Sequence, residues 1–161
     1  MFPKDLIELT DKLISACRKK DIKIATAESC TGGLIAGCIT SVAGSSDVFE
    51  RGYNTYSNNA KSEMLNIPID MIIANGAVSK AVAIAMCEGA LKTAPVQLAV
   101  SVTGIAGPGG GTIEKPVGTV HIASARAGRR TIEKAYLFVG NRDEIRMSTV
   151  TKAIEMMLNQ V

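Results

Sequence analysis

The chain contains no tryptophan, a single histidine and only 4% aromatic residues among its 161 positions. Proteins that bind nucleic acids present aromatic side chains for base stacking and clusters of basic residues for the phosphates. Here the net charge is only +3, and the longest run of one sign is Arg18-Lys19-Lys20, which a solvated helix end explains equally well. We therefore expect no nucleic-acid partner.

Metal ligands are also scarce. The cysteines Cys17, Cys30, Cys38 and Cys87 form no Cys-x-x-Cys pair, and His121 is the only imidazole. A structural zinc ion needs about four such ligands. We therefore expect no metal and no other cofactor, and we interpret the four thiols as reduced and mostly buried.

Long hydrophobic runs are absent as well. No stretch approaches the roughly 18 apolar residues of a membrane-spanning helix, and residues 1–15 are amphipathic with acidic residues, unlike the apolar centre of a signal peptide. We expect no membrane contact and a cytoplasmic location. With 161 residues, 47% hydrophobic and 20% charged, the chain has the size and composition of one globular domain, which we place at residues 1–161.

The sequence predicts a mixture of helices and strands. Apolar periodicity and capping residues predict, in chain order, a helix over 4–20, a strand over 22–27, a helix over 33–42, a strand over 49–57, a helix capped by Asn58, a helix from Ser79 to about 94, a strand over 97–102, a hairpin of 118–125 and 131–139, and a helix over 142–159 capped by Asn141. These connections favour an α/β or α+β sandwich with a partly parallel and partly antiparallel sheet.

The first candidate site is the segment AESCTGG at residues 27–33, between a predicted strand and a predicted helix. This position exposes the hydroxyl of Ser29 at a rim, and the helix start supplies backbone N–H groups that bind an oxyanion or another anion. From the turn alone, a simple capping role for Ser29 or Thr31 is the commoner interpretation. Cys30 is a rival nucleophile, but it has no evident histidine partner.

A serine nucleophile needs a base. His121 lies inside an alternating strand, where a structural role is commoner, so lysine is the remaining choice. Lys61 falls in the first turn of a predicted helix, from which its amine can reach back to the preceding strand, and the phenol of Tyr56 could relay or orient a proton. The amine works only if burial or positive potential lowers its pKa. By pattern alone, an exposed surface lysine is the favoured alternative.

A third candidate is the glycine-rich loop of residues 103–112, which follows an apolar strand. Backbone N–H groups in such loops bind phosphate, and α/β folds place ligands beyond strand ends. The order of residues is not that of a P-loop. A flexible surface turn is an equally weighted alternative.

Two arginines complete the candidate residues. Arg142 and Arg146 lie one turn apart at the start of the last predicted helix. They could hold a phosphate together with the helix terminus, or form a solvated face.

At these motifs the sequence resembles the CinA C-terminal domain family, whose standalone members are nicotinamide-nucleotide amidohydrolases. The resemblance spans nearly the whole chain and rests on AESCTGG at 27–33, TYSNNAK at 55–61, NGAVSKAVAIAMCEGA at 75–90, SVTGIAGPGGGT at 101–112, KPVGTVHIA at 115–123 and GNRDEIR at 140–146. Several motifs in the same order are far more specific than any one of them.

The resemblance implies a three-layer α/β/α sandwich, often a homodimer, that hydrolyses the carboxamide of nicotinamide mononucleotide without a metal. It implies Ser29 as nucleophile, Lys61 as base and Tyr56 as a supporting hydroxyl. The substrate-binding residues expected on this basis and from the motifs are Cys30, Thr31, Gly32, Gly33, Thr103, Gly104, Gly107, Gly109, Gly110, Gly111, Thr112, Arg142 and Arg146.

Three motifs depart from the usual family pattern. The commoner GGxVTYSNEAK is RGYNTYSNNAK at residues 51–61, HGAVS is NGAVS at 75–79, and GDR is GNR at 140–142. None of these changes removes a proposed catalytic group. Asn141 keeps the capping ability of an aspartate but not its charge, so the departures bear on substrate affinity and specificity more than on the reaction class.

The sequence is also compatible with two other functions. The first is a non-catalytic nucleotide-binding module of the competence/damage-inducible type, in which the glycine loop and the helix start bind phosphate without a tuned lysine. The second is a nucleic-acid-associated competence factor, which the weak charge and the sparse aromatic residues disfavour.

Overall fold

The computed structural model describes residues 1–161 and is built on one five-stranded sheet. The strands lie side by side in the order β2 (Phe49–Asn54), β1 (Ile24–Glu28), β3 (Leu98–Gly104), β4 (Thr119–Arg126) and β5 (Ile132–Leu137). β1 pairs in parallel with both β2 and β3, whereas β4 is antiparallel to β3 and β5 is antiparallel to β4. The prediction of a mixed sheet is confirmed.

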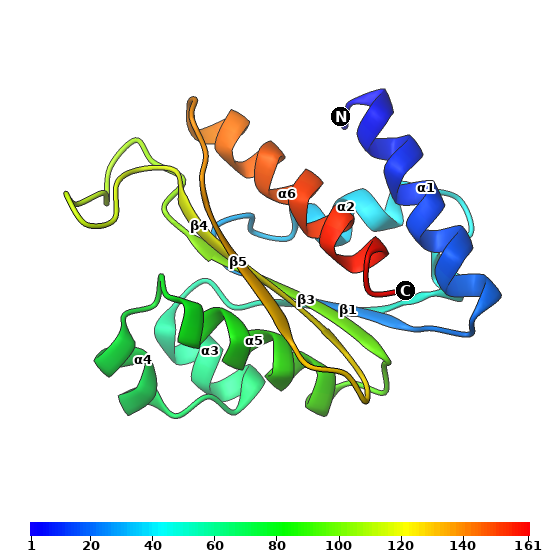
Figure 1. The fold of residues 1–161 in the computed structure, drawn as a ribbon, viewed down its shortest axis with the longest axis horizontal. Coiled ribbons are helices and arrows are strands. Elements are labelled where there is room, and N and C mark those ends of the chain that lie inside the picture. The colour runs from blue at the N-terminus through cyan, green and yellow to red at the C-terminus, as the bar shows by residue number, and fades with distance from the viewer.

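Helices cover both faces of this sheet (Figure 1). On one face lie α1 (Lys4–Lys19), α2 (Leu34–Thr40) and α6 (Arg142–Leu158); on the other lie α3 (Asn58–Leu65), α4 (Ile69–Asn75) and α5 (Lys80–Thr93). A short 3₁₀ helix, η1, spans Ser45–Asp47. This is the three-layer α/β/α sandwich that the family resemblance implied.

The order of the connections leaves a crevice at the carboxyl ends of the strands, which we call the ligand crevice. From β1 the chain passes through α2 to β2, and it then returns through α3, α4 and α5 to β3 on the other side of β1. In open α/β sheets, ligands bind at the carboxyl ends of strands where connections diverge in this way. The carboxyl ends of β1, β2 and β3 lie side by side there, since Glu28 pairs with Asn54 on one side and with Val102 on the other.

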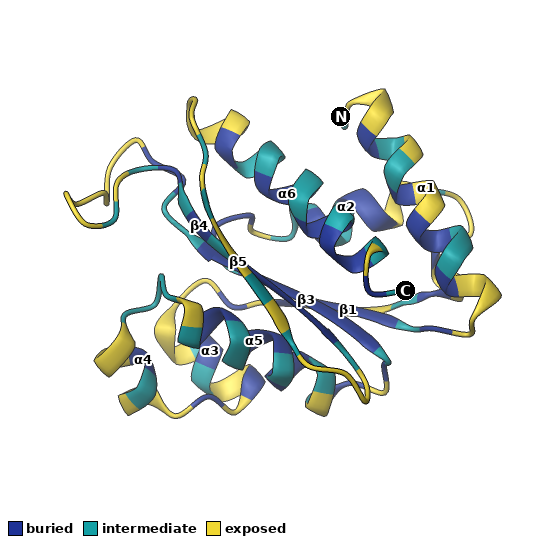
Figure 2. Ribbon diagram, viewed as in Figure 1, coloured by how far each residue is buried: buried dark blue, intermediate teal, exposed yellow.

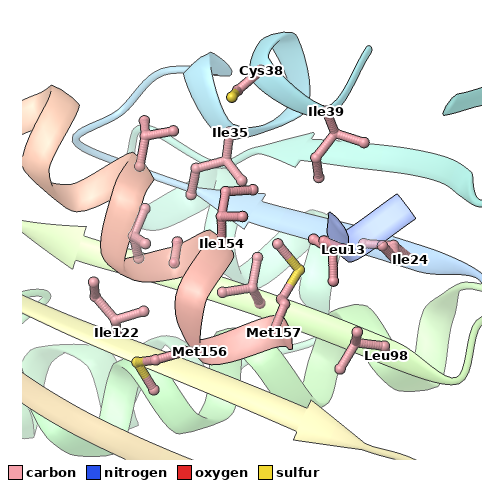
Figure 3. Packing of buried hydrophobic residues seen from close by; sticks show 14 of the residues in the cluster. Leu13, Ile24, Ile35, Cys38, Ile39, Leu98, Ile122, Ile154, Met156 and Met157 are labelled. Carbon is pink, nitrogen blue, oxygen red and sulfur yellow. The ribbon is translucent and has the colours of Figure 1, made fainter. Parts of the chain in front are cut away.

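Two apolar layers hold the sandwich together. A cluster of 23 buried residues fills the space between the sheet and α1, α2 and α6, and Figure 3 shows Leu13, Ile35 and Ile154 of these helices over the strands. The opposite layer, of 16 buried residues, is rich in alanine, which lets α5 approach the sheet closely. Strands β1 and β3 are buried on both faces, as Figure 2 shows, and therefore form a rigid base for the residues that follow them.

The structure corrects two predictions in the segment 57–75. The side chain of Ser57 caps α3 by accepting from the Ala60 N–H, so the prediction that Asn58 is the cap is wrong. The helix α4 was not predicted at all. It begins directly after Pro68, and of its residues only Ile72 is fully buried while Ile73 is 71% exposed, so it has no clear apolar stripe.

The remaining elements agree with the predictions to within about two residues at most ends. The predicted hairpin is the antiparallel pair β4–β5, and Asn141 caps α6 in a capping box with Glu144. All four cysteines are free and buried. None of the helices is both long enough and apolar enough to traverse a lipid bilayer.

Candidate active site

Ser29 stands directly after β1, an interior strand of the sheet, at the ligand crevice. Its backbone N–H donates to the Val102 carbonyl at 3.1 Å, which ties it to the neighbouring strand β3. Gly32 and Gly33, with φ of 60° and 96°, then turn the chain into α2. Such left-handed conformations strain residues that carry a Cβ, so the turn requires the two glycines.

Lys61 is buried next to this serine. Its side chain is 1% exposed, and its amine nitrogen lies 3.2 Å from Ser29 Oγ. The same nitrogen lies 2.9 Å from the carbonyl oxygen of Thr55 and 3.3 Å from that of Tyr56. No carboxylate is within ion-pairing distance of it. The alternative interpretation of Lys61 as an exposed surface residue is therefore wrong.

Burial lowers the pKa of Lys61 below its ordinary value of 10.5, and the nearby Cys30 sulfur opposes this shift to a smaller extent. The contacts of the amine also suit the neutral form. A neutral amine has two N–H groups for the carbonyls of Thr55 and Tyr56, and one lone pair that can accept from the Ser29 hydroxyl. The arrangement can thus move a proton from Ser29 to Lys61.

Ser29 and Lys61 border a cavity of about 300 Å³. This volume is at the lower end of the range of small-molecule sites. The walls are formed by the segments that follow β1 and β2, the turn between α4 and α5, the end of β3 with the loop that follows it, and one residue of α6. The lining residues are Ser29, Cys30, Tyr56, Asn58, Lys61, Ala77, Val78, Thr103, Gly104, Ile105, Ala106, Gly107, Gly109, Gly110 and Arg142.

Ten of the residues proposed from the sequence therefore meet at one cavity. Among the lining residues that were not proposed are Ala77 and Val78, which lie between α4 and α5. The Ala77 carbonyl accepts from the Thr103 hydroxyl at 2.8 Å. The only sequence signal for this wall was the motif NGAVS, which has no side chain with evident chemistry.

Tyr56 and Arg142 lie at the mouth of the cavity. The Tyr56 side chain is 63% exposed, and its hydroxyl is 3.3 Å from a guanidinium nitrogen of Arg142. The same guanidinium donates to the Gly107 carbonyl at 2.7 Å. Arg142 therefore connects the end of β2 with the glycine loop. Tyr56 contacts Lys61 through its carbonyl, and its role as a supporting hydroxyl stays a prediction.

Six of the proposed binding residues do not line the cavity: Thr31, Gly32, Gly33, Gly111, Thr112 and Arg146. Thr31 is fully buried, and its hydroxyl donates to Glu28 at 2.6 Å. Arg146 donates to the Thr31 carbonyl at 2.9 Å, and the Thr112 hydroxyl accepts from the Lys115 N–H. Contacts of these six with a substrate stay predictions.

The sequence of the turn suggested that the N–H groups at the start of α2 are free to bind an anion, but several of them already have an acceptor. The Glu28 carboxylate accepts from the N–H groups of Gly33, Ile35 and Ala36 at 3.1, 3.0 and 2.8 Å. The N–H groups of Cys30 and Thr31 donate no hydrogen bond within the chain. Of these two residues, only Cys30 lines the cavity, so within this turn its N–H is the one available to negative charge beside Ser29.

The rival groups Cys30 and His121 are less suited to catalysis. Burial raises the pKa of the Cys30 thiol to about 11, so the thiol stays protonated at neutral pH and is a poor nucleophile. His121 does not line the cavity, and its Nδ1 lies 2.7 Å from a carboxylate oxygen of Glu133. A structural role for His121 agrees with its place inside β4.

The comparisons with known proteins give one consistent result. The CinA C-terminal domain profile matches residues 6–161. The crystal structure of the competence/damage inducible protein CihA from Agrobacterium tumefaciens superimposes with a TM-score of 0.97 at 45% identity, covering 99% of both chains. The nicotinamide-nucleotide amidohydrolase PncC of Escherichia coli K12 is 43% identical over 160 residues, covering 99% of this chain and 97% of that protein.

Longer relatives match only in part. A CinA-like protein of Geobacter sp. M21 is 50% identical over 154 residues, which are 96% of this chain but 37% of that protein. The chain thus spans little more than a third of the CinA-like relatives of this length. Since the profile, the structure and the sequence of full-length relatives agree, this chain belongs to the CinA C-terminal domain family.

Proposed function

We propose that this protein is an amidohydrolase that converts nicotinamide mononucleotide and water to nicotinate mononucleotide and ammonia, with Ser29 as the nucleophile. The observation that carries this proposal is the buried amine of Lys61, 3.2 Å from Ser29 Oγ and without an ion-pair partner. The similarity to a relative named for this reaction, over nearly the full length of both chains, supports the choice of substrate.

In the first half of the reaction, the neutral Lys61 amine accepts the proton of the Ser29 hydroxyl, and Oγ attacks the carboxamide carbon. We assign the negative charge on the carbonyl oxygen to the free N–H group of Cys30, a residue that lines the cavity. Each well-placed donor of this kind contributes about 3 kcal/mol to transition-state stabilisation. Lys61 then gives its proton to the leaving nitrogen, ammonia departs, and an ester joins Ser29 to the nicotinoyl group.

In the second half, water replaces ammonia. Lys61 accepts a proton from this water as its oxygen attacks the ester carbon, and the Cys30 N–H again stabilises the oxyanion charge. When the bond to Oγ breaks, the proton returns to Ser29 and the carboxylate leaves. The carbonyls of Thr55 and Tyr56 keep the lone pair of the amine directed at the reacting atoms throughout.

We propose that the phosphate of the substrate binds at the mouth of the cavity. The glycine loop contributes N–H groups of Gly109 and Gly110, which have no acceptor within the chain, and Arg142 contributes a positive charge. Such groups are typical phosphate ligands. Arg142 would exchange one of its present acceptors, Gly107 or Tyr56, for the phosphate.

Two further expectations are part of the proposal. We propose a homodimer, which light scattering of the purified protein would test against a monomer mass of 16.9 kDa. We also propose a cytoplasmic location, since four free cysteines suit a reducing compartment.

The decisive experiment measures ammonia release from nicotinamide mononucleotide and from free nicotinamide. We expect activity on the nucleotide, much less on nicotinamide, and none in Ser29→Ala or Lys61→Ala. Mass spectrometry of the quenched enzyme should show an adduct on Ser29 with the mass of the nicotinate mononucleotide acyl group, ribose phosphate included. An active Ser29→Ala variant would refute the nucleophile, and tight nucleotide binding without ammonia release would favour the non-catalytic nucleotide-binding module.

A further inference from the structure

Glu28 is a buried carboxylate immediately before the proposed nucleophile. It is 1% exposed and forms no ion pair with any lysine or arginine. An isolated buried charge is very costly unless hydrogen bonds compensate it. Four donors do so here: the Thr31 hydroxyl at 2.6 Å and the N–H groups of Gly33, Ile35 and Ala36 at 2.8 to 3.1 Å.

These hydrogen bonds link the two ends of the turn that carries Ser29. They connect the last residue of β1 with the first residues of α2, so the intervening residues 29–32 are held at both ends. Within the turn, the Gly32 N–H donates to the Ser29 carbonyl at 3.1 Å. The guanidinium of Arg146 in α6 donates to the Thr31 carbonyl at 2.9 Å. The turn therefore has little freedom to change its backbone conformation.

We propose that Glu28 is a positioning residue for the nucleophile: it contacts no substrate, but it fixes Ser29 Oγ and the free N–H group of Cys30 relative to Lys61. This inference rests on the proposed Ser29 chemistry. Glu28 also occupies the N-terminus of α2, which would otherwise attract an anion.

Such positioning affects the rate of the reaction. Misplacing reacting groups by about 1 Å costs about 100-fold in rate, although the groups themselves are unchanged. Glu28→Gln keeps the size of the side chain but replaces one carboxylate oxygen by an NH₂ group. This group cannot accept, so at least one of the present donors loses its hydrogen bond. We expect this variant to fold, with a displaced turn.

The experiment compares Glu28→Gln with Ile39→Val, which removes a buried methyl group from the last turn of α2 and leaves the first turn intact. Both variants are measured well below their melting temperatures. The first readout is kcat and KM for nicotinamide mononucleotide. The second, which needs no substrate, is the rate constant for modification of Ser29 by a small fluorophosphonate, followed by mass spectrometry with Ser29→Ala as the blank.

We expect Glu28→Gln to lower both kcat and the modification rate by about 10- to 100-fold, with KM within about twofold. Ile39→Val should keep both rates within about twofold of the unmodified protein. Equal rates in Glu28→Gln and Ile39→Val would overturn the positioning role, as would a loss confined to KM. If the unmodified protein releases no ammonia but Ser29 is labelled, the substrate proposal fails and the labelling rates still decide on Glu28. If Ser29 is not labelled and no ammonia forms, both proposals are wrong.

Discussion

The amine nitrogen of Lys61 and the hydroxyl oxygen of Ser29 lie 3.2 Å apart, although 32 positions separate the two residues in the sequence. Ser29 follows β1, and Lys61 lies in the first turn of α3, just beyond β2. The pairing of Glu28 with Asn54 sets their relative height. A slip of one residue would shift the strands by about 3.3 Å and separate the pair, so the parallel register of β1 and β2 is a condition for the proposed chemistry.

The stability of the protein should depend on pH through Lys61. Because burial lowers its pKa below 10.5, the unfolded chain binds more protons than the folded chain between the lowered pKa and 10.5. The free energy of unfolding should therefore increase with pH across that range. In Lys61→Met this contribution is absent, so the stability difference between variant and unmodified protein should change steadily with pH in urea denaturation. Parallel curves from pH 7 to 10 would contradict a lowered pKa.

The rate should depend on the same ionisation. Only the neutral amine accepts the Ser29 proton, so kcat/KM for nicotinamide mononucleotide should rise with pH and level off above the lowered pKa of Lys61. The half-maximal point lies below 10.5 and belongs to the free enzyme. The measurement is a series of initial rates of ammonia release at constant ionic strength. A profile that falls with increasing pH from 6 to 9 would contradict a lysine base.

Long amphipathic helices and the hairpin were predictable from the sequence. The apolar stripe of α1 and the capping box of α6 fix these helices to within a residue or two, because the signals lie inside the elements themselves. The strand order was not predictable, since it depends on pairing between distant segments. α4 was missed because its seven residues bury only one side chain.

The candidate site was predictable in its residues but not in its electrostatics. The turn at Ser29 and the glycine loop each follow a strand, and this context is visible in the sequence. Burial of Lys61 is not, because α3 has no strong apolar face and the groups around its amine come from the turns after β1 and β2. Likewise, nothing local indicates that Glu28 turns toward α2 and uses the N–H groups that an anion would need.

Removal of the Cys30 thiol should separate the two possible nucleophiles. The thiol is 6% exposed, and burial raises its pKa to about 11. We therefore expect Cys30→Ala to keep its rate of ammonia release within about threefold, whereas Ser29→Ala should lose about 1000-fold or more. Iodoacetamide should inactivate the unmodified protein slowly at pH 7. Loss of activity in Cys30→Ala that matches that of Ser29→Ala would make Cys30 the nucleophile.

Arg142 should act on the phosphate of the substrate and not on the amide. Its guanidinium lies at the cavity mouth, where it donates to the Gly107 carbonyl and lies 3.3 Å from the Tyr56 hydroxyl. A charged hydrogen bond contributes about 1.5–3 kcal/mol, so Arg142→Ala should lower kcat/KM for nicotinamide mononucleotide by about 10- to 100-fold, mainly through KM. The unphosphorylated nucleoside is the control substrate, and its kcat/KM should change little.

Arg146→Ala is the matched variant. Because Arg146 donates to the Thr31 carbonyl, its loss should affect both substrates equally and mainly through kcat. An equal effect of Arg142→Ala on nucleotide and nucleoside would mean that the phosphate binds elsewhere.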